Sequence, residues 1–559
     1  MRVRSIVLFD LLLLTFSWLV AIVVVNPSGN FPLNDDWSYA IAVQRMLETG
    51  DFRPLGWTSS ALISQTIWGT AFCKVFGYSF EVLRGATLTV SLLGIFAIYI
   101  LALQLKLNRK KRLFLSLCIA FNPLWFALSF TFMTDVYFVT FTAITLLFFI
   151  RFLQEKKWID WTFGIVFSLV AILCRQFGLF IPMAFCVIFL FVNLKTFTNK
   201  KITIYTILQA ILPLFIGLAV LFFFQNWMKN TGRTPFAYGA QTGRLWSLLQ
   251  NPMELPTRFF KNTFIAFVYL GWFLLPLLAK RWTRTNSRRW VILLSAVVFS
   301  GLLYFNKLMP LGKNIIQKTG IGPLSLYDTM MLDLPGIGSI YSWLWLLITG
   351  LGVTGGSLLF YLITSILLKI LTRIWNRNLE REDAIVLFLL LGTFIYFLPI
   401  ALHGFFDRYL LPLLFLLPLA IFVFYDKNNT KIIRNSSENI AYLGMYISAL
   451  LFTVMFIFSI TTTHDYLSLN RTRWEAVRDL NEFENIPFSD IDGGLEFNGL
   501  YFYDAEYQTQ DTTGIWWWTG KRDYVFSFSE LPDFEAIKRY KYERWMPPHN
   551  AEIWILKRK

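Results

Sequence analysis

Two adjacent acids, Asp35 and Asp36, come shortly after the first long apolar stretch of the chain, Ser5–Val25. A charge beside a lipid bilayer is costly, so an acidic pair in this position usually has a function. A carboxylate in this position could take a proton from a hydroxyl group or could bind a metal ion. The alternative is structural, because either acid could cap the helix that begins here, and capping can coexist with catalysis.

Further polar residues lie where apolar spans begin or end, and each has a structural alternative. Asp135 could cap a helix, and Arg175 could anchor the protein at the membrane surface. Arg408 could form a local ion pair with the adjacent Asp407. His403 has no His or Glu partner at the spacing of metal ligands, so a structural hydrogen bond is favoured for it over metal binding.

The composition indicates an integral membrane protein. Of 559 residues, 56% are hydrophobic and 15% are charged, whereas soluble domains carry about 25% charged residues. The apolar segments are continuous runs of about 20 residues, which is typical of helices and not of a β-barrel. The net charge of +16 comes largely from short loops between apolar spans, where basic residues set topology, so we expect no nucleic-acid partner.

The elements that must position these side chains are transmembrane helices. Length and hydropathy predict an all-α polytopic fold with about 13 spans. The predicted spans are 5–26, 82–105, 113–131, 136–153, 158–174, 177–194, 203–225, 260–279, 290–305, 338–368, 384–402, 409–425 and 440–462.

The distribution of Lys and Arg predicts the orientation. With the N-terminus in the cytoplasm, every inner loop is basic, as the positive-inside rule requires. We therefore expect a multi-pass protein of the cytoplasmic (inner) membrane. Three long outer segments follow, 27–81, 226–259 and 306–337, and the first is predicted to contain helices that lie at the membrane interface.

The tail of the chain has a different character. Residues 472–484 form an amphipathic helical pattern, and residues 524–528 and 552–556 read as short strands. We expect a transmembrane catalytic domain over 1–463 and a small extracytoplasmic α/β domain over 464–559.

The order of these pieces resembles a known family. The pattern begins with an apolar span, the acidic pair Asp35 and Asp36, and the aromatic Tyr39. An outer loop and a second span that ends in basic residues follow. The chain is similar to the GT-C superfamily of integral membrane glycosyltransferases, family 39-like, in the branch of protein mannosyltransferases and lipid A aminoarabinose transferase. Three further matching pieces are Phe132-Met133-Thr134-Asp135, Cys174-Arg175-Gln176-Phe177-Gly178 and His403-Gly404-Phe405-Phe406-Asp407-Arg408-Tyr409-Leu410-Leu411-Pro412.

The resemblance implies an enzyme that uses a polyprenyl-phosphate-linked sugar on the outer face of the membrane. Asp35 matches the catalytic acid, and Asp36 would assist it, with a divalent metal ion as a further expectation. Arg408 and Arg175 would hold the donor phosphate, since guanidinium binds phosphate bidentately. Tyr39, Asp135, His403 and Asp407 are further site candidates.

The resemblance is incomplete. The second acid is Asp36 where Glu is usual, and Phe52-Arg53-Pro54-Leu55-Gly56-Trp57 replaces a His-Pro-Pro-like element. The expected function is transfer of the sugar to a lipid, glycan or protein by a single inverting displacement. The alternatives are a transporter or flippase of lipid-linked sugars, a ligase or polymerase of surface polysaccharide, and a non-catalytic scaffold.

Overall fold

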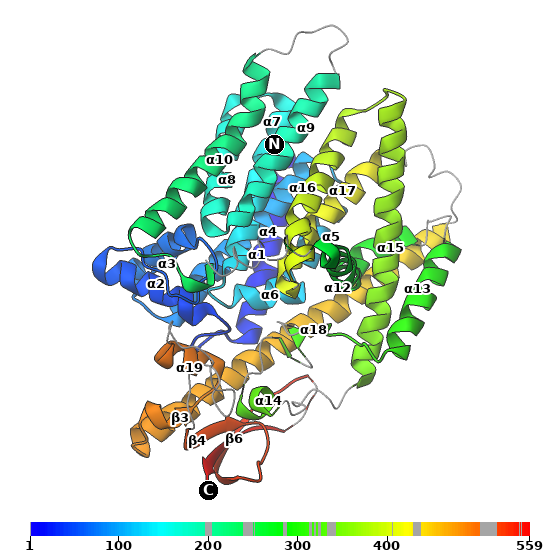
Figure 1. The fold of residues 1–559 in the computed structure, drawn as a ribbon. Helices are drawn as coiled ribbons and strands as arrows, with labels where there is room; N and C mark the ends of the chain where they lie inside the picture. Colours follow the sequence, from blue (N-terminus) through cyan, green and yellow to red (C-terminus); the bar gives the residue numbers. More distant parts are fainter. Residues whose placement is uncertain are drawn as a thin grey trace.

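A computed structural model describes residues 2–195, 204–238, 250, 252–282, 288–311, 316–317, 320–321, 326–332, 342–404, 406–428, 438–503, 522–546, 548 and 550–559. These residues form a bundle of long helices with a small sheet at one end, beside the C-terminus (Figure 1). The helices of the first half are α1 (Arg2–Val25), α2 (Asp36–Thr49), α3 (Ile63–Phe76), α4 (Phe80–Gln104), α5 (Arg109–Ala120), α6 (Pro123–Ser129), α7 (Thr134–Glu155), α8 (Trp158–Cys174), α9 (Phe180–Lys195) and α10 (Ile204–Asn230). Those of the second half are α12 (Leu255–Trp282), α13 (Arg288–Tyr304), α14 (Tyr327–Met331), α15 (Ser342–Trp375), α16 (Arg381–His403), α17 (Leu413–Asn428), α18 (Glu438–Arg478) and α19 (Leu495–Phe502).

Length and hydropathy identify ten or eleven candidate membrane spans in the described part of the chain, where the sequence predicted about 13. In the described part of the chain, ten helices are long and apolar enough to cross a membrane, or eleven if α5 and α6 together make one span. That pair is bent by 60°, because Pro123 begins α6 and the Asn122 side chain caps it. The two remaining predicted spans are α8 and α13, apolar helices of 17 residues each, which is at the lower limit of about 17–25 residues for a bilayer crossing.

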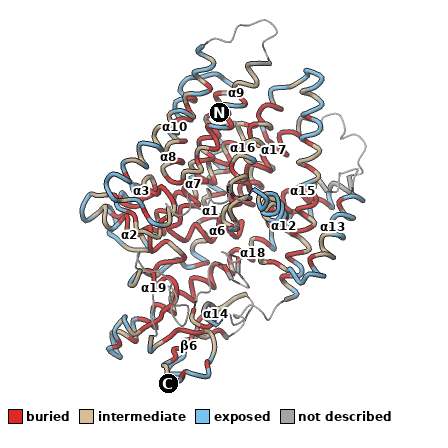
Figure 2. Tube along the Cα trace, in the orientation of Figure 1, coloured by how far each residue is buried: buried red, intermediate tan, exposed pale blue. Residues whose placement is uncertain are grey.

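The outer surface of the bundle is apolar, as lipid contact requires. Phe16 and Val23 of α1 are 67% and 77% exposed. Peripheral helices such as α10 and α13 carry many exposed positions, whereas the centre of the bundle is buried (Figure 2). This distribution is the one expected of a polytopic membrane protein.

Glycines allow one very close helix crossing, between α12 and α15. A Cβ atom on Gly271 would lie 2.0 Å from the carbonyl oxygen of Gly352 and 2.2 Å from the nitrogen of Gly356. The two backbones therefore touch directly. Small residues at a crossing are the usual means of tight packing between membrane helices.

The segment 27–81 contains helices, as predicted: α2 and α3 lie beside each other at the end of the bundle that carries the sheet (Figure 1). Arg84, in the first turns of α4, is 3% exposed and holds the segment that precedes α2. Its guanidinium donates to the backbone carbonyls of Pro27, Gly29 and Phe31, and also to that of Phe130.

The C-terminal region holds a four-stranded sheet with the order β3-β4-β6-β5. The strands are β3 (Ile491–Asp492), β4 (Tyr524–Ser527), β5 (Phe534–Tyr542) and β6 (Ala551–Arg558). β3 pairs with β4 in parallel, and the other two pairings are antiparallel. The predicted strands are confirmed, but most of the predicted helix 472–484 is the end of α18, which runs without a break from Glu438 to Arg478. The predicted domain boundary at residue 464 thus falls inside one helix.

Candidate active site

Asp35 occupies the N-cap position of α2 without capping it. Its side chain makes no hydrogen bond to the first turn of the helix. Instead, Oδ1 accepts a hydrogen bond from Trp57 Nε1 at 3.1 Å, and Oδ2 faces Arg408 Nη1 and Nη2 at 3.4 and 3.5 Å. The structural alternative for Asp35 therefore does not account for its orientation.

Arg408 belongs to a short 3-10 turn, η4 (Asp407–Leu410), that precedes α17. Its guanidinium lies 5.9 Å from the centre of the Tyr409 ring. The two contacts with Asp35 are longer than the roughly 2.7–2.9 Å of a strong charged hydrogen bond. Its buried Nε has no hydrogen-bond partner among the described residues. Arg408 thus retains donor capacity for an anionic ligand.

Arg175 also lies near Tyr409, 5.7 Å from the centre of the same ring. It follows α8 and precedes the 3-10 turn η1 (Gln176–Leu179). Its Nε donates to Thr134 Oγ1 at 2.6 Å, and its Nη2 pairs with Asp135 Oδ2 at 2.9 Å. Both partners are in the first turn of α7, so Asp135 holds Arg175 and does not cap the helix.

The two arginines line one polar cavity of about 30 Å³, which is about the share of one water molecule in liquid water. Burial and the proximity of Asp35 raise the pKa of Tyr39, so its hydroxyl group stays protonated. The cavity thus combines two cationic groups with several neutral donors, beside a carboxylate. Its other lining residues are Tyr39, Ser59, Ser60, Gln176, Phe177, Tyr396, Ile400 and Tyr409.

Asp36 is directed away from this cavity and holds backbone. Its Oδ1 accepts the N–H of Leu33 at 2.7 Å and its Oδ2 accepts the N–H of Phe132 at 3.0 Å. The side chain is buried, and burial raises its pKa to about 7 against the opposing effect of the two N–H groups and of Arg84. Asp36 therefore joins the segment 27–81 to the residues that precede α7.

The expected metal site does not fit these residues. Both oxygens of Asp36 accept backbone N–H groups, and Asp35 faces a guanidinium and an indole N–H. Over the residues that the structure describes, no three His, Cys, Asp or Glu side chains converge as metal ligands would. The chemistry of this site is therefore derived without a metal ion.

The remaining candidates lie beside the site. Asp407 does not form an ion pair with the Arg408 side chain in the way the sequence suggested. Its Oδ2 accepts the N–H of Ile316 and its Oδ1 accepts the N–H of Arg408, so it fixes η4 against a short hairpin, β1 (Ile316–Gln317) and β2 (Gly320–Ile321). His403 is the last residue of α16 and is not part of the cavity lining.

Sequence reasoning missed two residues that shape the site. Trp57, the hydrogen-bond donor to Asp35, was noted only as part of a segment that departs from the family pattern. Arg84 carried a usable signal, because it is a charged residue inside an apolar span.

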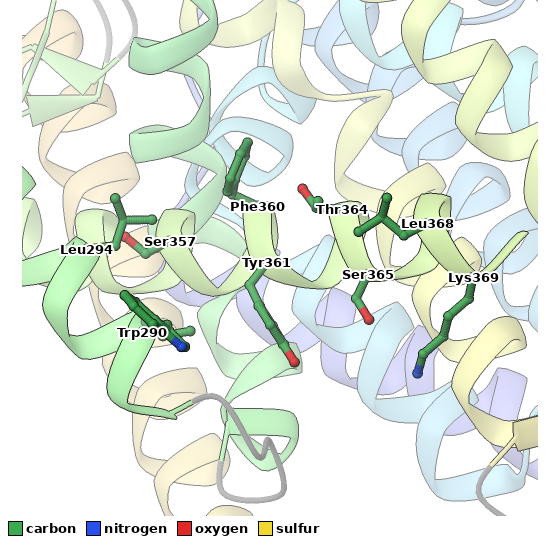
Figure 3. A pocket seen from close by; sticks show the side chains of 10 residues that line it. Trp290, Leu294, Ser357, Phe360, Tyr361, Thr364, Ser365, Leu368 and Lys369 are labelled. Atoms are coloured by element: carbon green, nitrogen blue, oxygen red, sulfur yellow. The ribbon is translucent and has the colours of Figure 1, made fainter. Parts of the chain in front are cut away.

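A much larger cavity, of about 520 Å³, lies between α13 and α15 (Figure 3). Tyr361, Ser365 and Lys369 lie along one side of α15, with Trp290 of α13 beside them (Figure 3). None of its lining residues is acidic or belongs to the candidate set. Its largely apolar lining suits lipid, and it offers no carboxylate that could act as the general base.

Comparison with known proteins supports the predicted resemblance. Residues 67–221 match the family model described as dolichyl-phosphate-mannose-protein mannosyltransferase. The predicted class of enzyme, a membrane glycosyltransferase with a lipid-phosphate sugar donor, is thereby confirmed. No curated protein matches the chain.

Two solved structures are similar at low sequence identity. ArnT from Cupriavidus metallidurans bound to undecaprenyl phosphate is 11% identical with a TM-score of 0.43, over 85% of this chain and 80% of that one. The oligosaccharyltransferase AglB from Archaeoglobus fulgidus, in complex with an inhibitory peptide and a dolichol-phosphate, is 13% identical with a TM-score of 0.43. The alignment with AglB covers 90% of this chain and 61% of the archaeal one.

Proposed function

We propose that this chain transfers a sugar from a polyprenyl-phosphate donor to an acceptor hydroxyl group at the outer face of the membrane, with Asp35 as the general base. The observation that carries the proposal is the Asp35 carboxylate, 3.4 Å from Arg408, beside a polar cavity that Arg408 shares with Arg175. The family match supports a donor of this type.

The proposed reaction is one inverting displacement. The acceptor oxygen attacks the anomeric carbon while the bond from that carbon to the phosphate oxygen breaks, and the bonding electrons remain on the phosphate. The acceptor proton passes to Asp35. A phosphate leaves as a stable anion and needs no general acid, so one carboxylate is sufficient, in contrast to the pair that glycosidases use.

The two arginines would serve the leaving group. Arg408 retains an unpartnered Nε donor within the described residues, and planar guanidinium groups match phosphate oxygens bidentately. Charge that develops on the phosphate in the transition state is then stabilised by donors that are already in place. The Tyr39 hydroxyl group, which remains protonated, could donate one further hydrogen bond.

The location of the site supports action at the outer face. The distribution of basic residues assigned the segments that contain Asp35, Asp135, Arg175 and Arg408 to the outer side, without use of the structure. In the structure these four side chains come together at one end of the bundle.

A transporter is less well supported. Such a protein is expected to place ionisable groups along a path through the membrane. The charged residues found within or next to the described spans, such as Asp10 with Arg109 and Asp383 with Arg373, are paired near helix ends.

The test is Asp35→Asn in purified protein reconstituted into lipid vesicles, with transfer measured from a polyprenyl-phosphate-linked sugar. Loss of the base should lower kcat by about 10²-fold or more. The matched control is Asp51→Asn, because Asp51 lies on the same outer segment and makes only a partly exposed pair with Arg233. Transfer by Asp35→Asn within a few-fold of the control would remove Asp35 from the role of base.

A further inference from the structure

The residue just before Asp35 is bound by a side chain from the far end of the chain. Asn34 has a left-handed backbone with φ +59°, a conformation that Asn tolerates better than most residues and that β-branched residues strongly disfavour. Its N–H donates to Glu496 Oε1 at 3.2 Å. Glu496 belongs to α19 in the C-terminal region, so this bond joins that region to the residue that precedes Asp35.

Glu496 is itself held in one orientation. The residue is fully buried, and its Oε2 pairs with Arg473 Nη1 at 2.8 Å. Its Oε1 also accepts from the Tyr466 hydroxyl at 3.2 Å. Arg473 is fixed in turn by Asn470 Oδ1 at 2.6 Å. A buried carboxylate that accepts three donors is a rigid support for the backbone that it binds.

A second connection runs from α19, through the Trp37 ring, to Trp57, which is the hydrogen-bond donor to Asp35. A Cβ atom on Gly499 would lie 2.4 Å from Trp37 Cε2, so α19 packs directly against α2. The Trp37 ring is stacked on Trp57 with centres 6.3 Å apart, and Trp57 donates the hydrogen bond to Asp35. The C-terminal region therefore supports Asp35 through its backbone and through its indole partner.

We infer that Glu496 is a positioning residue for Asp35, and that the C-terminal region is in this way a structural part of the active site. This inference rests on the proposed role of Asp35 as the base. Glu496 touches neither Arg408 nor Arg175 in the described structure, so it acts on the base and leaves the groups proposed for the donor phosphate in place.

A positioning role predicts a specific kinetic pattern. Misplacement of a reacting group by about 1 Å can cost about 10²-fold in rate. Glu496→Gln cannot serve all three donors, Asn34, Tyr466 and Arg473, because the amide has one acceptor oxygen where the carboxylate has two. We expect kcat to fall by about 10²-fold while the KM for the polyprenyl-phosphate donor stays within about threefold of wild type.

A second variant tests the same contact from the other side. Asn34→Val leaves Glu496 and its pair with Arg473 intact, but a β-branched residue strongly disfavours a left-handed backbone. It should show the same fall in kcat at nearly constant donor KM. Combined with Glu496→Gln it should add little, because both changes act on one element.

The matched control is Asp328→Asn. Asp328 of α14 is also a buried carboxylate that binds the C-terminal region, through the N–H of Phe528 at 2.9 Å. Among the described residues, it accepts hydrogen bonds from Thr329, Phe528 and Ser529, which do not reach the segment that carries Asp35. We expect this variant to retain the wild-type kcat.

The outcomes separate this inference from the proposed function. If Asp35→Asn is inactive and Glu496→Gln, in folded protein, transfers at the wild-type rate, the positioning role is wrong and the proposed function stands. The role is also wrong if Asn34→Val keeps the wild-type kcat, and this variant decides the question if Glu496→Gln does not fold. If Asp35→Asn is itself active, the proposed function fails.

Discussion

The buried carboxyl group of Asp36 allows a quantitative test of whether Asp36 is a structural residue that binds backbone, while Asp35 is the proposed base. Asp36→Asn keeps the size of the side chain but leaves one acceptor oxygen for two backbone donors, the N–H groups of Leu33 and Phe132. A buried N–H without a partner costs about 1–3 kcal/mol. At pH 5, where the wild-type group is protonated, we therefore expect the variant to be less stable by about this amount.

The same change should alter how stability depends on pH. Burial raises the pKa of Asp36 from 3.8 to about 7. Between about pH 4 and pH 7 the folded protein therefore keeps a proton that the unfolded chain has already released. The wild-type protein thus loses stability as the pH rises through this window. At 1.36 kcal/mol per unit, the total is roughly 4 kcal/mol at most. Asparagine does not titrate, so the variant should become more stable relative to wild type as the pH rises from 5 to 8.

The measurement is thermal unfolding of the detergent-solubilised protein at several pH values, with Asp51→Asn as the control for a partly exposed carboxylate of the same segment. The difference in unfolding midpoint between Asp36→Asn and wild type should shrink or change sign between pH 5 and pH 8. A difference that is constant over this range, or no destabilisation at pH 5, would refute the assignment of Asp36 as a buried structural group.

Two further predictions concern the donor site and the bundle. Arg408→Lys replaces a planar fork with a point charge, so we expect a 10- to 100-fold loss in kcat/KM for the polyprenyl-phosphate donor; an unchanged value would exclude bidentate phosphate binding by Arg408. Gly271→Ala places a methyl group 2.0 Å from the carbonyl oxygen of Gly352 and should lower the unfolding temperature markedly. Gly350→Ala is its control, since its new methyl group would meet Phe299 at an ordinary 3.7 Å, and equal unfolding temperatures for the two variants would contradict the close crossing of α12 and α15.

Much of the candidate site could be located from the sequence because its parts carry local signals. Asp35 follows an apolar span, and Arg175 and Arg408 lie at span ends, where charge is rare. Their juxtaposition could not be derived from spacing, since Asp35 and Arg408 are separated by 373 positions. The division of roles within the acidic pair was also hidden, because only the coordinates show that Asp36 binds backbone N–H groups while Asp35 faces Arg408 and Trp57.

The support from the C-terminal region had no usable signal in the sequence. Asn34 and Glu496 are 462 positions apart, and neither belongs to a family motif. Two of the predicted spans, α8 and α13, have 17 residues each, which is at the lower limit of length for a bilayer crossing. Hydropathy also does not register the bend that Pro123 introduces between α5 and α6.

The central claim is that a lipid-linked sugar phosphate binds between the two arginines with its anomeric carbon beside Asp35. The most direct measurement is an experimental structure of the Asp35→Asn protein with an intact polyprenyl-phosphate sugar. We predict that phosphate oxygens lie within about 3 Å of the guanidinium groups of Arg408 and Arg175, with residue 35 facing the anomeric carbon on the side opposite the phosphate. A phosphate bound elsewhere, such as at Lys369 in the cavity between α13 and α15, would contradict the account.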